Sequence, residues 1–491
     1  MSLLSAEIRS LGRRVAQTMT DPVVVPPARP APLRVLACKP RPERQTIRLE
    51  RFISSEPLEL EYLATVLEGE QLTLLDGMVD RRDPCRLARR LQAEVVLISA
   101  FVTNVHGVRA LAERLARLPR PPLVFVGGPH AEVVPEHFFS PGIAGVFFAD
   151  QLAALRTVVS RLHAGQPFTD VPGVAFPRPD GAFVRNPGPA LDPAALPLPR
   201  RTLLQAHPGR YRYMYLNRCA SVKTAFGCPE RCDFCFCTEQ QEGRYDARPL
   251  DAVVEEIAGL PTDHVFLLDD NFLTSPTRVT EFCDRIAGAG LRKRFIAYGG
   301  ADFVSRHPDL LARLRAVGLD MLVVGFEFLS DAELAAVHKR ARLADNDRTV
   351  EVCRALGIEL FALFIVDPAW RPEDFRRLAS YVRRREIAFA TFSTYTVFPG
   401  TALSRQLVAA GSPPPGPPWW RYDLLRLHAR PAHLSPLRYY LWLFYLYLLP
   451  GFSPATARRL RRLYGTRGFL RLLWLSMRTG IEFLIKLAIW R

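Results

Sequence analysis

The sequence of 491 residues is 48% hydrophobic and 23% charged, which excludes global disorder and predicts a packed core. At roughly 100–200 residues per domain, this length predicts about two to four domains. The net charge of +16 suits an anionic partner. From Pro431 onward ten Lys and Arg residues stand against one acid, Glu482, among many Leu, Trp, Tyr and Phe residues. This mixture favours a membrane surface and argues against nucleic acid.

The nine cysteines are not spaced like those of a small disulfide-stapled domain, and their number is odd. The first residues contain no apolar run of signal-peptide length. We therefore expect a reducing, cytoplasmic setting in which clustered cysteines bind metal.

The chain opens with a Pro-rich tail or linker, residues 1–32, and then alternates between strand and helix patterns over residues 33–165. Alternation at this spacing predicts an α/β domain with a doubly wound parallel sheet. In such sheets, ligands bind beyond the carboxyl ends of the strands. The expected strands are Leu33–Cys38, Gln71–Leu75, Glu94–Phe101, Leu123–Val126 and Gly145–Ala149.

Residues 166–215 are rich in Pro and Gly and are predicted to link two domains, with a small hairpin near Gly173–Phe176. Residues 216–405 resume the alternation, and six strand–helix units fit a partial (β/α)6 barrel. Barrel chemistry lies at the carboxyl ends of the strands. The expected strands end at Phe226, Leu268, Ala297, Phe326, Val366 and Phe398.

Residues 406–491 are predicted to form a helical C-terminal region. Tyr439–Leu449 is too short to cross a bilayer and is followed by Pro450-Gly451. Phe469–Trp490 is longer but carries four charged residues. We expect helices lying at a membrane surface, and give equal weight to the alternative that they only cap the barrel.

The strongest motif is Cys228-Pro-Glu-Arg-Cys232-Asp-Phe-Cys235. Thiolates are the usual ligands of iron–sulfur clusters, and this spacing lets one loop wrap one cluster. Three ligands leave one iron open to a small molecule. Structural zinc is the alternative, but zinc sites generally use paired two-residue gaps, and the chain has no second such pair. Cys237 is a candidate spare ligand.

This CxxxCxxC loop, with Phe before the last Cys, resembles that of the radical S-adenosylmethionine (SAM) superfamily. The resemblance implies a [4Fe–4S] cluster on Cys228, Cys232 and Cys235. Its open iron would bind the amino and carboxylate groups of SAM, and one electron would cleave SAM to methionine and a 5′-deoxyadenosyl radical. An external donor such as flavodoxin or ferredoxin would supply that electron.

The resemblance also implies SAM-binding residues at the ends of barrel strands. Asp269, Asp270 and Asn271 would accept from the SAM amino group, although helix capping is the competing role for such residues. Glu327 would contact the ribose. Lys339 or Arg340 would hold the carboxylate; the alternative for both is a solvated helix face.

The order of the two domains resembles the cobalamin-binding subclass of this superfamily. The fragments that carry this are Glu56–Tyr62, Ser99-Ala100-Phe101 and Val126-Gly127-Gly128-Pro129-His130. Gly127 and Gly128 would let the backbone approach the flat cobalamin ring.

Two departures from the cobalamin-binding pattern stand out. Cys38-Lys39-Pro40-Arg41 replaces the histidine-containing loop of methionine-synthase-like domains, so we expect no protein imidazole on cobalt. His106 and His130 are lone candidates, and a structural role is the alternative for both. A GEGE-like turn is replaced by Phe148-Ala149-Asp150-Gln151.

Further fragments over roughly residues 200–430 resemble the hopanoid C-3 methylase group; they include Gly325-Phe326-Glu327, His338-Lys339-Arg340 and Tyr422-Asp423-Leu424-Leu425. The resemblance implies a cobalamin-dependent C-methyltransferase acting on an unactivated carbon of an apolar or lipid substrate. Cobalamin-assisted radical oxidation, cyclisation or rearrangement is one alternative. A non-catalytic metal-binding protein at a membrane is another. We expect a cytoplasmic enzyme, peripheral at the inner face of the membrane.

Overall fold

The computed structural model describes residues 32–47, 51–178 and 180–489, so nearly all of the predicted Pro-rich tail lies outside the described residues. The described chain divides into two compact units. Unit 1 contains the described residues up to Glu43 together with Pro57–Ala206. Unit 2 contains the described part of Arg44–Glu56 together with the chain from His207 onward.

Unit 1 is built on a seven-stranded sheet in the order β3-β1-β4-β5-β6-β7-β8. The strands from β3 to β6 are parallel, and the β7–β8 hairpin adds to one edge in antiparallel pairing. The five residues of β4 are all buried, as expected for a central strand covered on both faces. The strands are β3 (Gln71–Asp76), β1 (Arg34–Lys39), β4 (Val95–Ser99), β5 (Leu123–Gly127), β6 (Gly145–Phe147), β7 (Val174–Pro177) and β8 (Phe183–Arg185).

Helices alternate with these strands, and local sequence sets their ends. Asp83 caps α3 by accepting from the backbone N–H of Arg86 at 2.8 Å, and Pro84 follows at the first helical position. Gly165 ends α6 in the left-handed conformation. The helices are α2 (Leu58–Val66), α3 (Pro84–Leu91), α4 (Val105–Ala116), α5 (Pro129–Val133), α6 (Gln151–Ala164) and α7 (Thr202–Ala206).

Unit 2 is built on six parallel strands in the order β11-β14-β15-β16-β17-β18. Each strand pairs with the one that follows it, as in a partial barrel. The strands are β11 (Cys219–Val222), β14 (His264–Leu267), β15 (Arg294–Gly299), β16 (Leu319–Glu327), β17 (Glu359–Val366) and β18 (Phe389–Thr394). The helices between them are α9 (Leu250–Ala258), α10 (Pro276–Gly288), α11 (Ala301–Arg306), α12 (Pro308–Ala316), α14 (Leu343–Leu356) and α15 (Pro372–Arg384).

The first and last strands of this sheet end earlier than the sequence predicted, at Val222 rather than Phe226 and at Thr394 rather than Phe398. At the first strand, the backbone N–H groups of Thr224 and Ala225 donate to the Asp269 carboxylate instead of to a neighbouring strand. The chain beyond them forms β12 (Ala225–Phe226), which pairs with β13 (Asp246–Ala247) in a separate two-stranded sheet.

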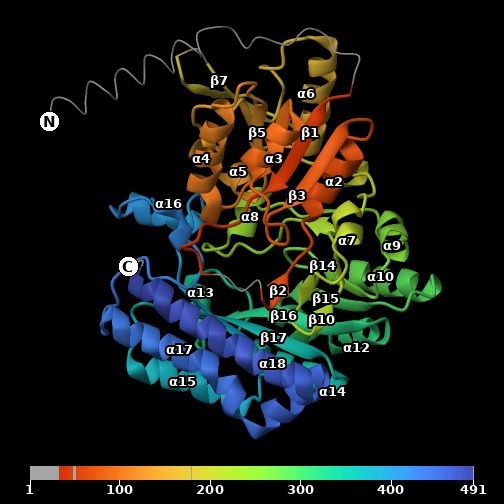
Figure 1. Cartoon of the computed structure of the whole chain (residues 1–491). Helices are drawn as coiled ribbons and strands as arrows, with labels where there is room; N and C mark the ends of the chain where they lie inside the picture. The colour runs from red at the N-terminus through yellow and green to blue at the C-terminus, as the bar shows by residue number, and fades with distance from the viewer. Residues whose placement is uncertain (1–31, 48–50, 179, 490–491) are drawn as a thin grey trace, which may run out of the picture. The chain divides into compact units, whose positions relative to one another are not determined.

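Two long helices, α17 (Pro436–Phe452) and α18 (Pro454–Ile489), complete unit 2 and lie side by side (Figure 1). Helix α17 continues past Pro450-Gly451, where the sequence predicted an interruption, and ends at Phe452. Helix α18 kinks at Gly465, whose φ is 68°. No helix within the described residues is both long and apolar enough to cross a bilayer.

The inner face of α18 packs on the barrel. Leu460 and Phe469 are buried in one cluster with residues of the two edge strands, Cys219 of β11 and Phe389 of β18. The same cluster contains residues of all six strands, so this face of the helix packs against the sheet as a whole. This is the capping role that the sequence left open, and it concerns only one face of the helix.

Candidate functional site

Three cysteines lie on one short loop, residues 228–235, between β12 and helix α8 (Phe236–Gln240); we call it the cluster loop. Cys228 and Cys232 are buried, Cys235 is half-buried, and all three are free thiols. The backbone N–H of Cys235 donates to the Cys232 carbonyl at 3.0 Å, which closes the turn. Phe234 packs against an apolar cluster formed by Phe328, Leu334, Val337 and Ile365. One anchored loop thus presents all three predicted ligands.

Burial and hydrogen bonding give the three thiols different pKa values. Burial raises the pKa of Cys228 to about 11 and that of Cys232 to about 12. A hydrogen bond from Cys237 lowers the pKa of Cys235. Iron would deprotonate all three, because a coordinating thiol binds as the thiolate. Within the described ranges, no three His, Cys, Asp or Glu side chains are grouped so as to hold a single metal ion.

Basic residues that follow helix α13 (Asp331–Ala336) hold the cluster loop in place. His338 Nδ1 lies 2.8 Å from the Asp233 carboxylate, and Arg340 lies 3.5 Å from Glu230. The backbone N–H of Asp233 also donates to the carbonyl of Val337 at 3.4 Å. Both acids belong to the Cys228–Cys235 motif, so two residues of the His338-Lys339-Arg340 run bind the loop through the motif's own side chains.

A second element, α16 (Ala402–Ala409), binds the same loop and the helix after it. The backbone N–H of Leu403 donates to the carbonyl of Asp233 at 2.9 Å. Gln406 Nε2 donates to the Asp233 carboxylate at 3.2 Å. Arg405 pairs with Glu239 of α8 at 2.9 Å. Asp233 is therefore the point at which two distant segments meet the cluster loop.

Lys339 and Glu327 form a buried ion pair. Lys339 Nζ lies 3.1 Å from Glu327 Oε1, and the two side chains are only 15% and 11% exposed. Burial lowers the pKa of Lys339, but the charges of Glu327, Cys232 and Cys235 together outweigh burial. The net shift is upward, so the ammonium stays charged. This geometry excludes the solvated-face alternative for Lys339. Arg340, with a side chain 62% exposed, remains largely in solvent.

Glu327 ends strand β16 in a strained backbone conformation. Its φ is 57°, in the left-handed region that side chains with a Cβ rarely occupy. The pairing of β16 with β17 shifts register between Gly325 and Glu327. A Cβ at Gly325 would lie 2.0 Å from Glu327 Oε1 and 3.0 Å from Lys339 Nζ. Strain of this kind clusters at functional sites, and here it fixes the direction of a buried carboxylate.

Asp269, at the carboxyl end of β14, holds the start of the cluster region. It accepts from the backbone N–H of Thr224 at 2.6 Å, the Thr224 hydroxyl at 2.5 Å and the backbone N–H of Ala225 at 3.1 Å. Burial raises its pKa to about 6. These contacts hold the chain between β11 and β12 and are not those of a helix cap, and contact between Asp269 and SAM stays a prediction.

Asp270 and Asn271 lie closer to the cysteines. Asp270 accepts from the backbone N–H of Gly227, the residue before the first cysteine, at 3.0 Å and from Lys223 Nζ at 3.3 Å. Asn271 hydrogen-bonds the thiol of Cys228 and thereby lowers the pKa that burial raises. The structure thus brings two of the three predicted acceptors to the edge of the cluster loop.

In unit 1, Gly127 and Gly128 lie against the chain itself. Gly128 has a φ of 97°, and a Cβ there would lie 2.7 Å from the backbone nitrogen of Ala100. Its N–H donates to Gln151 Oε1 at 2.9 Å, and the same oxygen would lie 2.5 Å from a Cβ at Gly127. Packing within the unit therefore accounts for both glycines, and their contact with cobalamin stays a prediction.

His130 belongs to the packed interior of unit 1. Its side chain is 1% exposed, and its Nε2 lies 2.9 Å from Nδ1 of His137. Burial lowers the pKa of His130 to about 3, so the ring is neutral. These observations match the structural alternative for His130. His106, on α4, is half-buried.

Two family models match this chain, one mostly within unit 1 and the other within unit 2. The B12 binding domain matches residues 48–159, and the radical SAM superfamily matches residues 222–382. The chain therefore combines a B12 binding domain with a radical SAM domain, the combination expected of a cobalamin-binding radical SAM enzyme. This confirms the predicted family and fold class, and the protein is therefore a radical SAM enzyme.

Relatives of this radical SAM enzyme include two groups with different chemistry. The hopanoid C-3 methylase of Methylococcus capsulatus is 28% identical over 393 residues, covering 76% of this chain and 73% of the relative. The anaerobic magnesium-protoporphyrin IX monomethyl ester cyclase of Synechocystis is 23% identical over 415 residues, covering 80% of each. The solved structure of the cobalamin-dependent SAM radical enzyme OxsB matches with a TM-score of 0.68 and 14% identity, over 92% of this chain and 72% of that one. At this identity the structural match concerns the fold alone.

The cofactors of the family are cobalamin, a [4Fe–4S] cluster and SAM, as the sequence predicted. The donor set fits the cluster, because three free thiols lie on one fixed loop. Polar and aromatic side chains gather at the carboxyl ends of β1 and β4, where the sequence predicts the cobalamin ligand. Lys39 lies 4.7 Å from the Phe101 ring centre, and Glu59 binds both Lys39 and Ser99.

The sequence did not identify Glu230, Asp233 and Thr224 as parts of the site. Glu230 and Asp233 stand inside the cysteine motif itself, but their partners in the basic run His338-Lys339-Arg340 lie about 105 residues later in the sequence. Thr224 carried no comparable signal, because its importance comes from a backbone turn towards Asp269.

Proposed function

We propose that this enzyme transfers a methyl group to an unactivated carbon of an apolar substrate, and that the substrate is a hopanoid-like triterpenoid. The observation that carries this proposal is the similarity to the hopanoid C-3 methylase across 76% of the chain. The membership of the cobalamin-dependent radical SAM methyltransferase family supports the reaction type.

In this proposal Cys228, Cys232 and Cys235 hold the cluster. Bound together, cluster, SAM and cobalamin supply hydrogen-atom abstraction and a transferable methyl group. The hydrogen bond from Asn271 favours the thiolate of Cys228, and the backbone hydrogen bonds at Asp233 hold the loop. Domain boundaries at 33–165 for cobalamin, 216–405 for the barrel and 406–491 for the helical region belong to the same proposal.

Lys339 and Glu327 have the SAM-binding roles in this proposal. The Lys339 ammonium binds the carboxylate of SAM, and the strained Glu327 accepts from the ribose. Their ion pair, 3.1 Å long, keeps both side chains buried and pointed at one place before SAM binds. Preorganised charge of this kind costs no reorganisation when the ligand arrives. Asp270 is an acceptor for the SAM amino group next to the loop.

A second function is favoured by one observation, the similarity to the anaerobic cyclase over 80% of the chain. A cobalamin-assisted radical cyclisation or oxidation would use the same cluster loop and SAM contacts. The two functions differ in what leaves the substrate and what enters it, so product mass separates them.

The deciding experiment is anaerobic turnover by the enzyme reconstituted with iron, sulfide and cobalamin. A detergent-solubilised hopanoid, SAM and reduced flavodoxin are supplied, and products are read by mass spectrometry. Methyl transfer predicts a mass gain of one methylene and formation of 5′-deoxyadenosine. Loss of hydrogen or gain of oxygen without a new carbon would assign the enzyme to the second function. Cys235→Ala is the control that should form neither product.

The protein's setting completes the proposal. Nine free cysteines suit a reducing compartment and an external one-electron donor of the flavodoxin or ferredoxin type. An apolar substrate places the enzyme at the inner face of a membrane, as a peripheral protein.

A further inference from the structure

The outer face of helices α17 and α18 is unusually apolar. Of the fifteen large apolar side chains exposed among the described residues, eleven lie on these two helices. Met477 is 59% exposed and Trp474 is 50% exposed, on a helix whose inner face is buried in the barrel. The eleven are Leu437, Leu441, Tyr445, Leu448, Leu470, Leu473, Trp474, Met477, Ile481, Leu484 and Ile485.

These residues form two stripes, because they recur at spacings of three and four along each helix, which places them on one side. The stripes adjoin where the helices touch. A Cβ at Gly480 would lie 2.7 Å from the Phe444 ring, and the rings of Tyr440 and Phe483 are 6.0 Å apart. Together the stripes make one apolar surface, which we call the outer face.

Exposed arginines run along the α18 side of the outer face. Arg467, Arg471 and Arg478 are all exposed and are separated by four and seven residues, so they line one edge of the stripe. The Arg478 guanidinium lies 5.4 Å from the Trp474 ring centre. The only acid from Pro431 onward, Glu482, is neutralised by Arg51 at 2.7 Å and Lys486 at 3.1 Å. The outer face is therefore apolar, and the charges along its α18 edge are basic.

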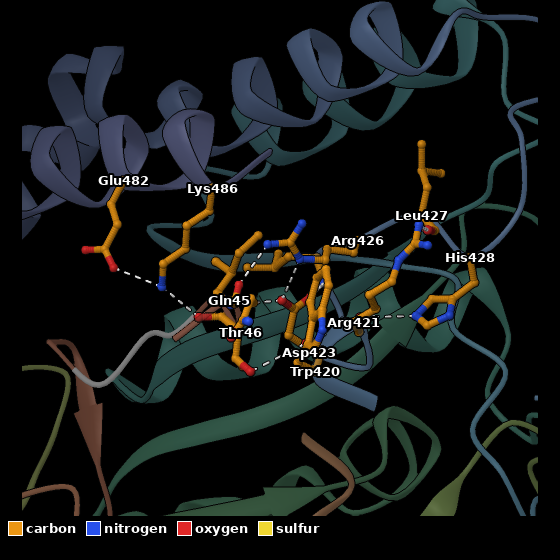
Figure 2. A network of polar contacts seen from close by, with 12 residues as sticks. Gln45, Thr46, Trp420, Arg421, Asp423, Arg426, Leu427, His428, Glu482 and Lys486 are labelled. Atoms are coloured by element: carbon orange, nitrogen blue, oxygen red, sulfur yellow. Dashed lines mark hydrogen bonds and ion pairs between the residues drawn. The ribbon is translucent and has the colours of Figure 1, made fainter. Parts of the chain in front are cut away.

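The two helices that carry the outer face are fixed to the rest of unit 2. Lys486 Nζ donates to the carbonyl of Thr46 at 2.7 Å, beside a buried pair in which Arg426 Nε lies 3.3 Å from the Asp423 carboxylate (Figure 2). On helix α17, the Tyr439 hydroxyl donates to the carbonyl of Val366, the last residue of β17, at 2.8 Å. Helix α17 thus begins at the carboxyl edge of the sheet, where barrel chemistry takes place.

We propose that the outer face docks on an anionic phospholipid bilayer, with the apolar stripes in the acyl boundary and the arginines at the headgroups. Interfacial helices combine a large apolar face with Lys and Arg in this way. A second copy of the chain would bring the same arginine row and a net charge of +16 against itself. Residues 1–31 carry four Arg and two acids, so they too share the sign of the face.

The proposal deepens the proposed function, on which one clause of it rests: a lipid-soluble substrate would reach the barrel edge from the bilayer without crossing water. Docking itself follows from the outer face alone. It is therefore measured without substrate. A failure to bind vesicles would not contradict methyl transfer, and a failure to transfer methyl would not contradict docking.

The test is flotation of the full-length holoenzyme with vesicles of phosphatidylcholine alone and of phosphatidylcholine with phosphatidylglycerol. We expect binding to the anionic vesicles that weakens as salt is raised. Trp474→Ser combined with Met477→Ser and Ile481→Ser should abolish flotation. The matched control, Leu198→Ser combined with Leu407→Ser and Val408→Ser, removes the same number of exposed apolar side chains elsewhere and should float normally.

The arginine row is tested in the same way. Arg467→Gln with Arg471→Gln and Arg478→Gln should weaken binding about a hundredfold, since each basic residue near an anionic surface contributes about 1 kcal/mol, a factor of about five in affinity. Arg89→Gln with Arg90→Gln and Arg120→Gln removes equal charge from unit 1 and should change binding little. Failure of the wild type to float would overturn the proposal. So would a loss of binding in the control variants as large as in the variants of the outer face. A wild-type dimer that the Trp474 set converts to a monomer would assign the face to a second copy instead.

Discussion

Replacing Lys339 with Met tests whether the buried ion pair serves SAM or only the fold. Lys339 Nζ lies 3.1 Å from Glu327 Oε1, and its side chain is 15% exposed. Its removal leaves the Glu327 carboxylate, 11% exposed, without its cation at a residue whose φ is 57°. Leaving a buried charge uncompensated costs about 3–5 kcal/mol of unfolding free energy.

The same substitution removes a charged donor from the proposed SAM carboxylate site. A hydrogen bond to a charged group contributes about 1.5–3 kcal/mol, so SAM affinity should fall about 10- to 150-fold. The double variant Glu327→Gln with Lys339→Met separates the two effects. It restores much of the stability, because no lone charge remains, while the SAM carboxylate still lacks its partner.

Unfolding is followed by urea titration under anaerobic conditions, and SAM affinity by equilibrium dialysis against the cluster-loaded protein. Arg340→Met is the control, because its side chain is 62% exposed and its partner Glu230 is 3.5 Å away. It should lose less than about 1 kcal/mol. Recovery of wild-type SAM affinity in the double variant would refute the carboxylate role and leave Lys339 as a partner of Glu327 alone.

Two further predictions concern the cluster loop and unit 1. Ala at any of the three cluster-loop cysteines should abolish the brown absorbance of the cluster and SAM cleavage, whereas Cys237→Ala should keep both; a full cluster in Cys235→Ala would contradict the ligand set. Unit 1 should lose stability in acid, because burial lowers the pKa of His130 to about 3 while the unfolded chain protonates near 6.5. The stability is complete above about pH 6.5 and falls by about 1.4 kcal/mol per pH unit below it, about 2 kcal/mol by pH 5. His130→Asn should weaken the fall of the urea midpoint between pH 7 and pH 5. If the midpoint falls as steeply as in the wild type, His130 does not cause the loss of stability in acid.

The sequence was most informative where one local pattern determines the structure. Alternating strand and helix signals predicted both parallel sheets, because each signal depends on neighbouring residues alone. The cysteine motif predicted a single loop for the same reason. The predicted strand ends at Phe226 and Phe398 were each four residues too late. The end of the first strand depends on a long-range contact. Asp269, 45 residues beyond Thr224, accepts the backbone hydrogen bond that would otherwise extend β11.

Side-chain partners were the least predictable part of the site. Lys339 and Arg340 are adjacent in sequence and were given the same two alternatives, yet one is buried against Glu327 and the other is largely exposed. The left-handed turn at His338, with a φ of 55°, accounts for this difference, because it changes the direction of successive side chains. Nothing in residue type or spacing signals such a turn, since His338 is not a glycine.

Helix α18 has two faces with different roles, and the sequence treated them as competing explanations. Phe469 is 4% exposed within the cluster that joins β11 to β18, whereas Trp474, little more than one turn later, is 50% exposed on the outer face. Phe469→Ala should therefore lower the unfolding free energy by about 3–5 kcal/mol. Trp474→Ala should change it by less than about 0.5 kcal/mol. Urea denaturation of the lipid-free protein measures both, and equal losses would mean that both faces of α18 are packed within the protein and that the outer face is not available to a membrane.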